Sequence, residues 1–296
     1  MSIIAEPSDN GAALIAAING ASKSVHMTMY ILTDKDIINA LLARAAAGVE
    51  VKVVLNQKFP NTTFNSNLSV YNTLRTATPP VSVVWASSTF SYTHEKSIVL
   101  DGATAWIMTM NASAAALTDN REYLAVDTIA GDVAEAEAQF AADFAGTPYT
   151  PQGALLMSPV TMRPGLQTLI NSAAQTLDFE VEEFTDTSLS SYFCTAVSKG
   201  VVVRGALSDT PPTATETTVI KKLQACGVSL VTRSSPYIHA KAIVADSARA
   251  YVGSANFSYT SLEYNRELGL VTSEPAAVAI VAQTLASDIA LGTAIP

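Results

Sequence analysis

Two short His-x-Lys motifs contain the side chains of this chain that are best suited to chemistry. His94 and Lys96 form the first motif, and His239 and Lys241 form the second. On a β-strand, residues i and i+2 point to the same face about 6.5–7 Å apart, so each motif presents an imidazole beside an ammonium group. An imidazole can act as a nucleophile, a base or an acid, and an ammonium group compensates negative charge. A single copy could be an ordinary solvated strand face, but two copies favour a shared function.

The two motifs occupy equivalent positions in an internal repeat. Residues 94–122 align with residues 239–267 at a constant offset of 145, and 13 of these 29 positions are identical. Upstream the offset is 152, as shown by the aligned pairs Asp34 with Asp186 and Gly48 with Gly200. The first half therefore has a net seven extra residues before its His-x-Lys motif. A repeat of this length indicates a duplicated structural unit, which we expect at residues 1–148 and again at 149–296.

Each half has the pattern of alternating strands and helices. We expect Ala-rich amphipathic helices at residues 10–22 and 162–175, and strands at 24–32 and 176–184. The helices that follow are bounded by N-cap and C′ residues, namely Asp34 and Asp186 at their starts and Gly48 and Gly200 just past their ends. An Asp-Gly pair after the first His-x-Lys strand indicates an antiparallel hairpin. The pattern predicts an α/β fold in which each half has a mixed sheet flanked by helices.

Further polar residues recur in both copies and could complete a site. Asn111 and Asn256 lie at the end of the returning strand, so they can come back alongside the His-x-Lys pairs. A histidine that attacks a substrate needs its other ring nitrogen engaged, so that its tautomer and orientation are set. Glu122 and Glu267, which end the repeated triplet Asn-Arg-Glu, are candidates for that role. A surface ion pair with the preceding arginine is the alternative.

Taken together, these residues resemble the HxKxxxxD motifs of the phospholipase D superfamily. The resemblance covers the whole chain, and both copies contain the His, Lys, Asp, Asn and trailing Glu. The first half departs from the pattern by having Met108-Thr109 where the second has Gly253-Ser254. Because Thr109 keeps the hydroxyl group, we expect function to survive. The resemblance implies two α/β sandwich halves packed about a pseudo-two-fold axis, with both His-x-Lys motifs in one active site.

The resemblance also implies a phosphodiesterase that works through a phosphohistidine. His94 would be the nucleophile, and His239 would protonate the leaving oxygen and then activate water. Fixed donors and charges would stabilise the phosphate, supplied by Lys96, Lys241, Asn111 and Asn256. We therefore expect neither a metal ion nor another cofactor.

Other residues near the motifs are expected to be structural. Asp101 lies about 16 Å along an extended strand from Lys96, at a hairpin turn where Asp favours local backbone hydrogen bonds. Asp246 is its counterpart in the second half. His26 has no histidine partner in the repeat, because Asp178 takes its place, and we expect it to be a packed strand residue.

Two pairs of residues in the second half leave an alternative open. Glu180 and Glu182, near the end of one strand, could line the pocket or form a half-buried ion pair. Cys194 and Cys226 have no metal-binding spacing, and we expect two buried unpaired side chains. A disulfide between two helices is the alternative, and it would require an oxidising compartment.

The reaction type is better defined by the sequence than the substrate is. The net charge is −9, and the sequence lacks the stripe of basic residues that usually binds nucleic acid. A phospholipid at a membrane or micelle surface is therefore the favoured substrate, with no nucleic-acid partner and a monomeric protein. Loop aromatics could dip into such a surface, namely Phe59, Phe64, Tyr71, Phe90, Tyr92 and Tyr237. The alternatives are a metal-independent endonuclease of the same superfamily and a degenerate, non-enzymatic lipid- or phosphate-binding module.

The sequence contains few signals for cellular location. No apolar run reaches the roughly 18 residues that a membrane-spanning helix needs. The N-terminus lacks the basic start and apolar stretch of a signal peptide. The low Lys content and richness in Ala, Thr and Ser slightly favour a secreted or periplasmic protein in its mature form, after removal of a leader peptide, over a cytoplasmic one.

Overall fold

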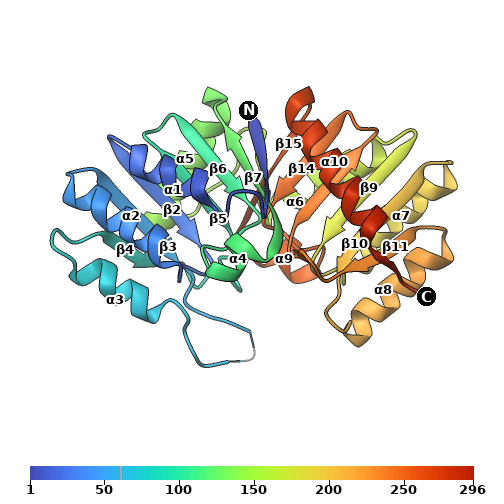
Figure 1. The fold of residues 1–296 in the computed structure, drawn as a ribbon, viewed down its shortest axis with the longest axis horizontal. Coiled ribbons are helices and arrows are strands. Elements are labelled where there is room, and N and C mark those ends of the chain that lie inside the picture. The colour runs from blue at the N-terminus through green and yellow to red at the C-terminus, as the bar shows by residue number, and fades with distance from the viewer. Residues whose placement is uncertain (61) are drawn as a thin grey trace.

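Two α/β halves lie side by side in the computed structural model, which describes residues 1–60 and 62–296. In Figure 1 the first half is on the left and the second on the right, and the N-terminus lies near the middle. Within the described residues, the strands form two mixed sheets of eight strands each, with helices against their faces. This confirms the predicted fold class, a duplicated α/β sandwich.

The first half begins with an edge strand and continues as alternating helices and strands. Its elements are β1 (Ser2–Glu6), α1 (Ala12–Gly20), β2 (Ser24–Met29), α2 (Lys35–Ala46), β3 (Glu50–Leu55), α3 (Leu68–Thr76), β4 (Ser82–Trp85), β5 (Lys96–Leu100), β6 (Thr104–Met108), α4 (Ala114–Thr118), β7 (Asn120–Asp127) and α5 (Ala130–Ala145). The expected boundary between residues 148 and 149 falls in the segment that follows α5.

The second half repeats this order, with two short strands added. Its elements are β8 (Leu156–Ser158), α6 (Met162–Asn171), β9 (Thr176–Val181), α7 (Thr187–Ser198), β10 (Val202–Ser208), α8 (Ala214–Ala225), β11 (Ser229–Arg233), β12 (Tyr237–Ile238), β13 (Lys241–Ala245), β14 (Arg249–Gly253), α9 (Tyr259–Glu263), β15 (Glu267–Thr272), α10 (Pro275–Leu291) and β16 (Thr293–Ala294). In the described part of the chain, no helix combines the length and apolar character needed to cross a membrane.

The sheet topology brings each His-x-Lys motif to the carboxyl end of parallel strands. In the first sheet β2, β3 and β4 are parallel, and β5 lies antiparallel beside β2. Met29 at the end of β2 pairs with Lys96 at the start of β5. Val181 of β9 pairs with Lys241 of β13 in the same way. This is the edge at which open α/β sheets place their ligand sites.

The predicted helix boundaries are confirmed at four positions. The side chain of Asp34 accepts hydrogen bonds from two N–H groups in the first turn of α2, and that of Asp186 accepts one from Leu189 in α7. Gly48 and Gly200 follow these helices with φ angles of +83° and +88°, a conformation that favours glycine. The strands expected at 24–32 and 176–184 end earlier, at Met29 and Val181. The residues after them leave the sheet toward the site.

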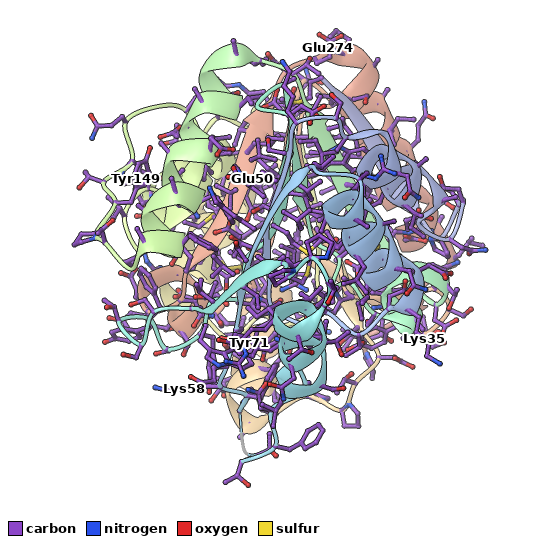
Figure 2. All side chains as sticks on the ribbon, turned by 90° about the vertical axis from the view of Figure 1, so that its left-hand side faces the viewer. Lys35, Glu50, Lys58, Tyr71, Tyr149 and Glu274 are labelled. Atoms are coloured by element: carbon purple, nitrogen blue, oxygen red, sulfur yellow. A yellow bond between two sulfur atoms is a disulfide. The ribbon has the colours of Figure 1, made fainter. Side chains whose placement is uncertain are left out.

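Hydrophobic side chains form one core in each half and a third between the halves. The third core joins β5–β7 and α5 to β13–β15 and α10. Many of its members are small, which lets the two sheets approach closely: Ala105, Ala125, Ala240, Ala242 and Ala250. Figure 2 shows side chains filling the space between sheets and helices, with charged residues such as Lys35, Lys58 and Glu274 at the periphery. Burial of this apolar surface holds the halves in one fixed arrangement.

The main chain also crosses between the halves at two equivalent places. β12 of the second half pairs in parallel with β7 of the first, so that Ile238 lies opposite Arg121. At the equivalent place, Thr93 of the first half forms a parallel bridge with Arg266 of the second. Each crossing segment leads directly into a His-x-Lys motif. Each histidine therefore lies against the opposite half of the molecule.

Cys194 and Cys226 form a disulfide, so the expectation of two unpaired cysteines was wrong. Cys194 lies in α7, and Cys226 follows the last residue of α8. These two helices pack side by side, which brings the Cα atoms within 5.5 Å, a separation typical of a disulfide. Neither side chain is fully buried. The pair tethers two neighbouring helices far from the His-x-Lys motifs.

His26 is a packed strand residue, as predicted. Its ring stacks on Phe140 of α5 with centroids 4.8 Å apart, and its two nitrogens contact Glu137 and Glu50. At the equivalent place in the second half, Asp178 forms an ion pair with Arg204. Both positions lie on strands that support the site without taking part in it.

Candidate active site

The backbone that precedes β5 places His94 against the second half. The N–H of His94 donates a hydrogen bond to the carbonyl oxygen of Arg266 at 2.9 Å. Two residues later Lys96 is fully buried, and its Nζ donates to the carbonyl oxygen of His94 at 2.6 Å. The imidazole and the ammonium group of the first motif are thus fixed beside each other, as their spacing predicts.

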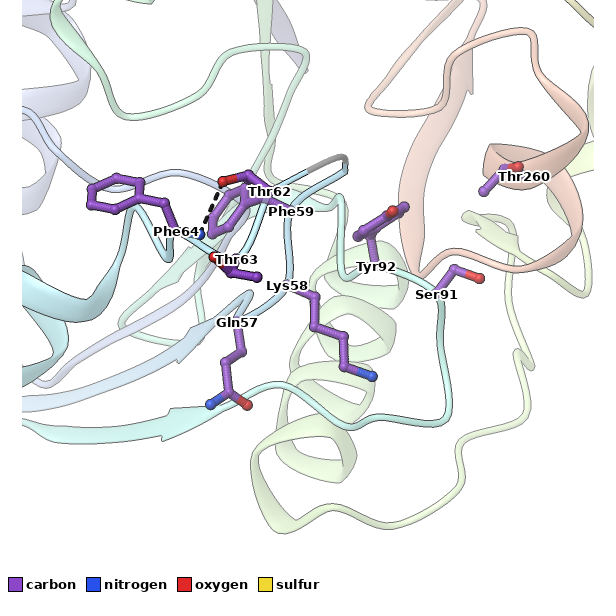
Figure 3. A pocket seen from close by; sticks show the side chains of 9 residues that line it. All are labelled: Gln57, Lys58, Phe59, Thr62, Thr63, Phe64, Ser91, Tyr92 and Thr260. Carbon is purple, nitrogen blue, oxygen red and sulfur yellow. Dashed lines mark hydrogen bonds between the residues drawn. The ribbon is translucent and has the colours of Figure 1, made fainter.

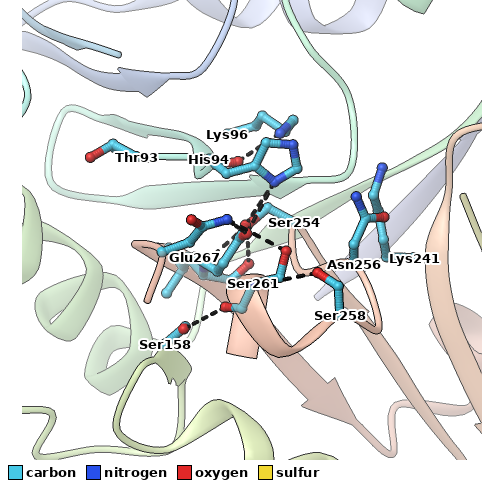
Figure 4. A network of polar contacts seen from close by, with 12 residues as sticks. Thr93, His94, Lys96, Ser158, Lys241, Ser254, Asn256, Ser258, Ser261 and Glu267 are labelled. Carbon is cyan, nitrogen blue, oxygen red and sulfur yellow. Dashed lines mark hydrogen bonds and ion pairs between the residues drawn. The ribbon is translucent and has the colours of Figure 1, made fainter. Parts of the chain in front are cut away.

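Glu267 of the second half contacts the ring of His94. Its carboxylate lies 3.0 Å from Nδ1 of His94, as Figure 4 shows. Two donors fix the carboxylate in turn: the Ser254 hydroxyl at 2.7 Å and the Asn265 amide at 3.0 Å. A carboxylate at Nδ1 keeps the proton on that nitrogen, which leaves the lone pair of Nε2 available.

His239 has the corresponding arrangement, with Glu122 of the first half as its partner. Nδ1 of His239 lies 2.7 Å from Glu122, as an ion-pair contact rather than a well-aligned hydrogen bond. Thr109 and Asn120 donate to this carboxylate, as Ser254 and Asn265 do to Glu267. Thr109 therefore replaces the serine hydroxyl at its repeat position, as expected.

The repeated triplet Asn-Arg-Glu builds the site of the opposite half. Both glutamates have no exposed surface, which excludes the alternative of a surface ion pair. The arginines instead bind aspartates on the long helices of the other half. Arg121 pairs with Asp288 of α10, and Arg266 pairs with Asp143 of α5. Sequence reasoning missed these two bridges, although the aspartates also align at the offset of 145.

Burial and neighbouring charges shift the protonation of the site. Burial lowers the pKa of Lys96 against the pull of Glu267, and with the added effect of nearby Lys241 the pKa is about 7. Burial also lowers the pKa of His94, although the carboxylate of Glu267 opposes this. The pKa of Glu122 is lowered: burial raises it, but His239 and Lys241 outweigh that effect. The first motif therefore favours a neutral imidazole beside an easily deprotonated lysine.

Asn111 and Asn256 follow β6 and β14 and lie at the same edge of the sheets. Each is almost fully buried, and the side-chain oxygen of each has no hydrogen-bond partner among the described residues. In Figure 4 the amide of Asn256 lies beside the ammonium group of Lys241. Buried amides with unused hydrogen-bonding capacity are expected where a polar ligand binds.

The residues directly after β2 and β9 also reach the site. Tyr30 follows β2, and its ring lies 4.6 Å from the ring of His94. Glu182 follows β9, and its carboxylate contacts Lys241 at 2.8 Å. The sequence left open whether the latter lines the pocket or forms an ion pair, and it forms the ion pair. Tyr30 was missed, because the residue aligned with it at the offset of 152, Glu182, shares no chemistry with it.

The side chain of Glu180 lies in the contact between the halves. Its carboxyl group is buried and accepts a hydrogen bond from the Tyr123 hydroxyl at 3.0 Å. Burial and the nearby carboxylate of Asp288 raise the pKa of Glu180 well above its usual value. Its role is to pack the second sheet against the first.

Asp101 and Asp246 have the structural role that their position at a turn predicts. The Asp101 carboxylate accepts backbone hydrogen bonds from Ser22, Lys23 and Ser24, which tie the β5–β6 turn to the start of β2. Burial raises its pKa, but these hydrogen bonds together outweigh that effect and lower the pKa to about 2. Asp246 receives equivalent bonds from residues 174–176. Both aspartates stand at the far end of their strands from the lysines.

Three of the loop aromatics line a pocket of about 770 Å³ next to the first half-site, namely Phe59, Phe64 and Tyr92 (Figure 3). Phe59 packs against Tyr30 with ring centroids 5.2 Å apart, and Tyr30 in turn contacts His94. The other aromatics have local packing partners: Tyr71 stacks on Trp85, Phe90 covers the guanidinium of Arg266, and the Tyr237 hydroxyl contacts Thr210. Phe64 is 72% exposed, so one large apolar ring stands free at the mouth.

The acidic residues around the motifs are paired with imidazoles, arginines and lysines rather than with one another. In the part of the chain that the structure describes, no group of three or more His, Cys, Asp or Glu side chains is placed to hold a metal ion. Buried lysine and amide side chains from both halves lie at the edge of the sheets that carries the two motifs: Lys96, Lys241, Asn111 and Asn256. Such a donor set suits an anion with several oxygens.

Comparison with known proteins agrees with this architecture. The chain superposes on phosphatidylserine synthase from Haemophilus influenzae with a TM-score of 0.76 and 12% identity, covering 99% of this chain and 87% of the synthase chain. It superposes on polyphosphate kinase from Porphyromonas gingivalis with a TM-score of 0.75 and 15% identity, covering 96% of this chain but 46% of the kinase chain. The chain thus spans about half of the kinase, and at these identities the likeness shows a shared fold.

Sequence comparison identifies the family. No protein with a curated description matches the chain. The family model described as "Cardiolipin synthase, PLD-like domain" matches residues 14–144 and 166–289, which include both His-x-Lys motifs. Because these two segments make up most of both halves, the chain belongs to this PLD-like family and hence to the phospholipase D superfamily.

Proposed function

We propose that this protein is a phosphodiesterase of the phospholipase D type, which releases head groups from phospholipids through a phosphohistidine. The observation that carries the proposal is the pair of crossed His–Glu contacts, Glu267 with His94 and Glu122 with His239. Each contact orients one imidazole, and the lysine of each motif lies directly beside it. A nucleophile, an acid and compensating charge are the groups that phosphoryl transfer requires.

In the first step, His94 attacks the phosphorus atom of the diester. Its Nε2 lone pair forms the P–N bond, the P–O bond to the head group breaks, and His239 gives its proton to the leaving oxygen. Lys96, Lys241, Asn111 and Asn256 donate to the phosphate oxygens as charge builds on them. Donors fixed in this way are worth roughly 2.7–4 kcal/mol each in transition-state stabilisation.

In the second step, water replaces the head group. His239, now neutral, removes a proton from water. The water oxygen attacks phosphorus, and the P–N bond to His94 breaks. The products are a phosphatidic acid and the regenerated pair of histidines. An alcohol that enters in place of water gives a transphosphatidylation product by the same route.

The contacts of the two histidines support this division of roles. Burial lowers the pKa of His94, which favours the neutral form that attacks. Nε2 of His239 lies 3.4 Å from the carboxylate of Glu182, while its Nδ1 contacts Glu122. His239 thus has a carboxylate at each ring nitrogen, whereas His94 has one at Nδ1.

Charge and surface favour a lipid over a nucleic acid. The net charge is −9, and the pocket next to the first half-site contains one lysine, Lys58, among aromatic and hydroxyl side chains. A nuclease gains most of its affinity from Lys and Arg contacts to many phosphates. The aromatic pocket suits the apolar part of a lipid, and exposed Phe64 could enter a lipid surface.

The decisive experiment compares two substrates under the same two conditions. Choline release from phosphatidylcholine micelles and cleavage of plasmid DNA should be measured side by side, with excess EDTA and with added divalent metal. We expect choline release that persists in EDTA and no cleavage of DNA. His26→Asn is the matched control for His94→Asn, because His26 also contacts glutamates but lies outside the site. DNA cleavage without lipid hydrolysis would favour the nuclease. The absence of both activities would favour a binding module.

A further inference from the structure

The two half-sites differ at one position beside the reacting groups. In the first half this position is Tyr30, whose ring lies beside His94 and 5.0 Å from Nζ of Lys96. In the second half the aligned residue is Glu182, which places a carboxylate where the first half has an uncharged ring. The site is therefore polarised, although the chain is a duplication.

Glu182 contacts each of the groups that would meet a substrate in its half. One oxygen, Oε2, lies 2.8 Å from Nζ of Lys241, 3.4 Å from Nε2 of His239 and 3.5 Å from Nδ2 of Asn256. The side chain keeps 27% of its surface exposed, so the carboxylate borders the open part of the site. Burial raises its pKa, but His239 and Lys241 outweigh this and hold the pKa well below its usual range, so the group is ionised.

The position of Glu182 specifies what it faces during the reaction. If His239 protonates the leaving oxygen, that oxygen must approach Nε2 of His239. The same nitrogen is the one that Glu182 contacts. The departing alcohol therefore passes beside the carboxylate, whereas the retained part of the substrate lies on the side of Tyr30 and the aromatic pocket (Figure 3).

We infer that Glu182 selects substrates by the charge of the leaving alcohol: it favours an alcohol that bears an ammonium group and disfavours a neutral or anionic one. The inference rests on the proposed function for the direction in which the substrate lies. Opposite charges attract across a partly buried site and like charges repel, and such contacts set specificity more than raw affinity. At the aligned position of the first half, the uncharged ring of Tyr30 supplies no such charge.

Ligand binding tests the inference without requiring turnover. Phosphocholine and 3,3-dimethylbutyl phosphate differ only in one atom, the cationic nitrogen of choline, which is a neutral carbon in the second ligand. Calorimetric titration of the wild-type chain should show phosphocholine binding about tenfold more tightly, which corresponds to ~1.4 kcal/mol. Glu182→Gln should bring the two affinities within about twofold of each other. Glu183→Gln is the matched control, because the Glu183 carboxylate accepts from Thr185 and touches none of the three donors.

Turnover gives a second measurement that does not depend on the amount of folded enzyme. Dihexanoyl phosphatidylcholine and the corresponding 3,3-dimethylbutyl ester can be compared as monomers by 31P NMR, using the ratio of their kcat/KM values. Because both substrates meet the same preparation, partial unfolding of the Glu182→Gln variant cancels in the ratio. We expect a ratio of about ten in the wild type and near one in the variant.

The outcomes separate this inference from the proposed function. Equal ligand affinities in the wild type, or an unchanged preference in Glu182→Gln, would overturn the inference even if both esters are cleaved. An equal gain for both ligands in the variant would also overturn it, because Glu182 would then act only as a counter-ion to the empty site. A binding preference lost in Glu182→Gln, with neither ester cleaved, would support the inference and refute hydrolysis.

Discussion

Glu267 holds Nδ1 of His94 at 3.0 Å, although the two residues belong to different halves of the chain. Glu122 approaches His239 in the reverse direction at 2.7 Å. Each half therefore supplies a histidine that it cannot orient by itself. The strand pairing explains this exchange, because Ile238 lies opposite Arg121 and Thr93 opposite Arg266, directly before the two histidines. The site exists only where both halves meet.

Glu267→Gln should lower kcat by about 100–10,000-fold while the protein stays folded. The amide of glutamine can donate to Nδ1 and so stabilise the tautomer whose Nε2 carries the proton and cannot attack. The matched control is Glu137→Gln, which alters an equivalent His–Glu contact at His26 outside the site. Initial rates with bis(p-nitrophenyl) phosphate across the pH range provide the measurement. A loss of less than twofold, or an equal loss in the control, would contradict the positioning role.

The contacts that could be predicted are those that the repeat itself displays. Two aligned His-x-Lys pairs, with an Asn and a Glu at matching distances, identify the reacting groups, and Asp34 and Gly48 mark helix ends by local chemistry. The crossed partners were beyond reach, because a period or a cap says nothing about which half a glutamate faces. Asp143 and Asp288 lie on helices where an acidic residue usually faces solvent. Their burial follows from how the halves pack.

The same reasoning explains the two other differences from expectation. Cys194 and Cys226 are paired because α7 and α8 are neighbours, and spacing alone could not distinguish that from two separate thiols. Tyr30 reaches the site because β2 ends at Met29, so that Tyr30 is the first residue beyond the strand. An aligned position with different residue types, tyrosine and glutamate, shows no shared chemistry in sequence. Only the structure places both beside a His-x-Lys pair.

Arg266→Ala should destabilise the protein by about 3–5 kcal/mol, because it leaves the buried carboxylate of Asp143 without its partner. Replacing both residues with apolar ones, as Arg266→Met with Asp143→Leu, should recover at least half of that loss. Urea unfolding of the wild type, Arg266→Met, Asp143→Leu and the double variant gives the coupling free energy. Additive losses in the double variant would show that the bridge does not couple the halves.

Lys96 should take up a proton when an anion binds above neutral pH. Its pKa in the folded protein is about 7, well below the unfolded value near 10.4, so it is mostly neutral in the empty site at pH 8. An anion beside it favours the charged form and raises the pKa. The same shift implies that its contribution to stability increases as pH rises from about 7 to about 10.4, since the unfolded state then binds more protons.

Calorimetry with dimethyl phosphate, in buffers of different ionisation enthalpy, measures this uptake directly. We expect up to one proton at pH 8 and almost none at pH 6. Glu95, whose pKa burial raises to about 7, titrates in the same range, so a control is needed. Lys96→Arg keeps the charge without titrating and should abolish the uptake. Uptake that persists in Lys96→Arg would assign the proton to another group.

A covalent intermediate should divide between water and alcohol. In about 5% ethanol, phosphatidylcholine should yield phosphatidylethanol beside phosphatidic acid, because either hydroxyl can give its proton to His239 and attack the phosphohistidine. The rate of choline release should stay the same if formation of the intermediate limits turnover. Product ratios by mass spectrometry test this. Hydrolysis with no ethanol adduct at any ethanol concentration would indicate direct attack by water.

The roles of the two histidines can be separated by the leaving group. An alkoxide must be protonated as it departs, but p-nitrophenolate leaves without help, so the acid is then needed only as the base of the second step. With bis(p-nitrophenyl) phosphate, His239→Ala should release about one equivalent of nitrophenol and stop as a phosphohistidine at His94. His94→Ala should give no burst, because no attacking nitrogen remains. Mass spectrometry of the stopped protein locates the added phosphoryl group. Finding it on His239 would reverse the assignment, and a burst in neither variant would exclude the two-step route.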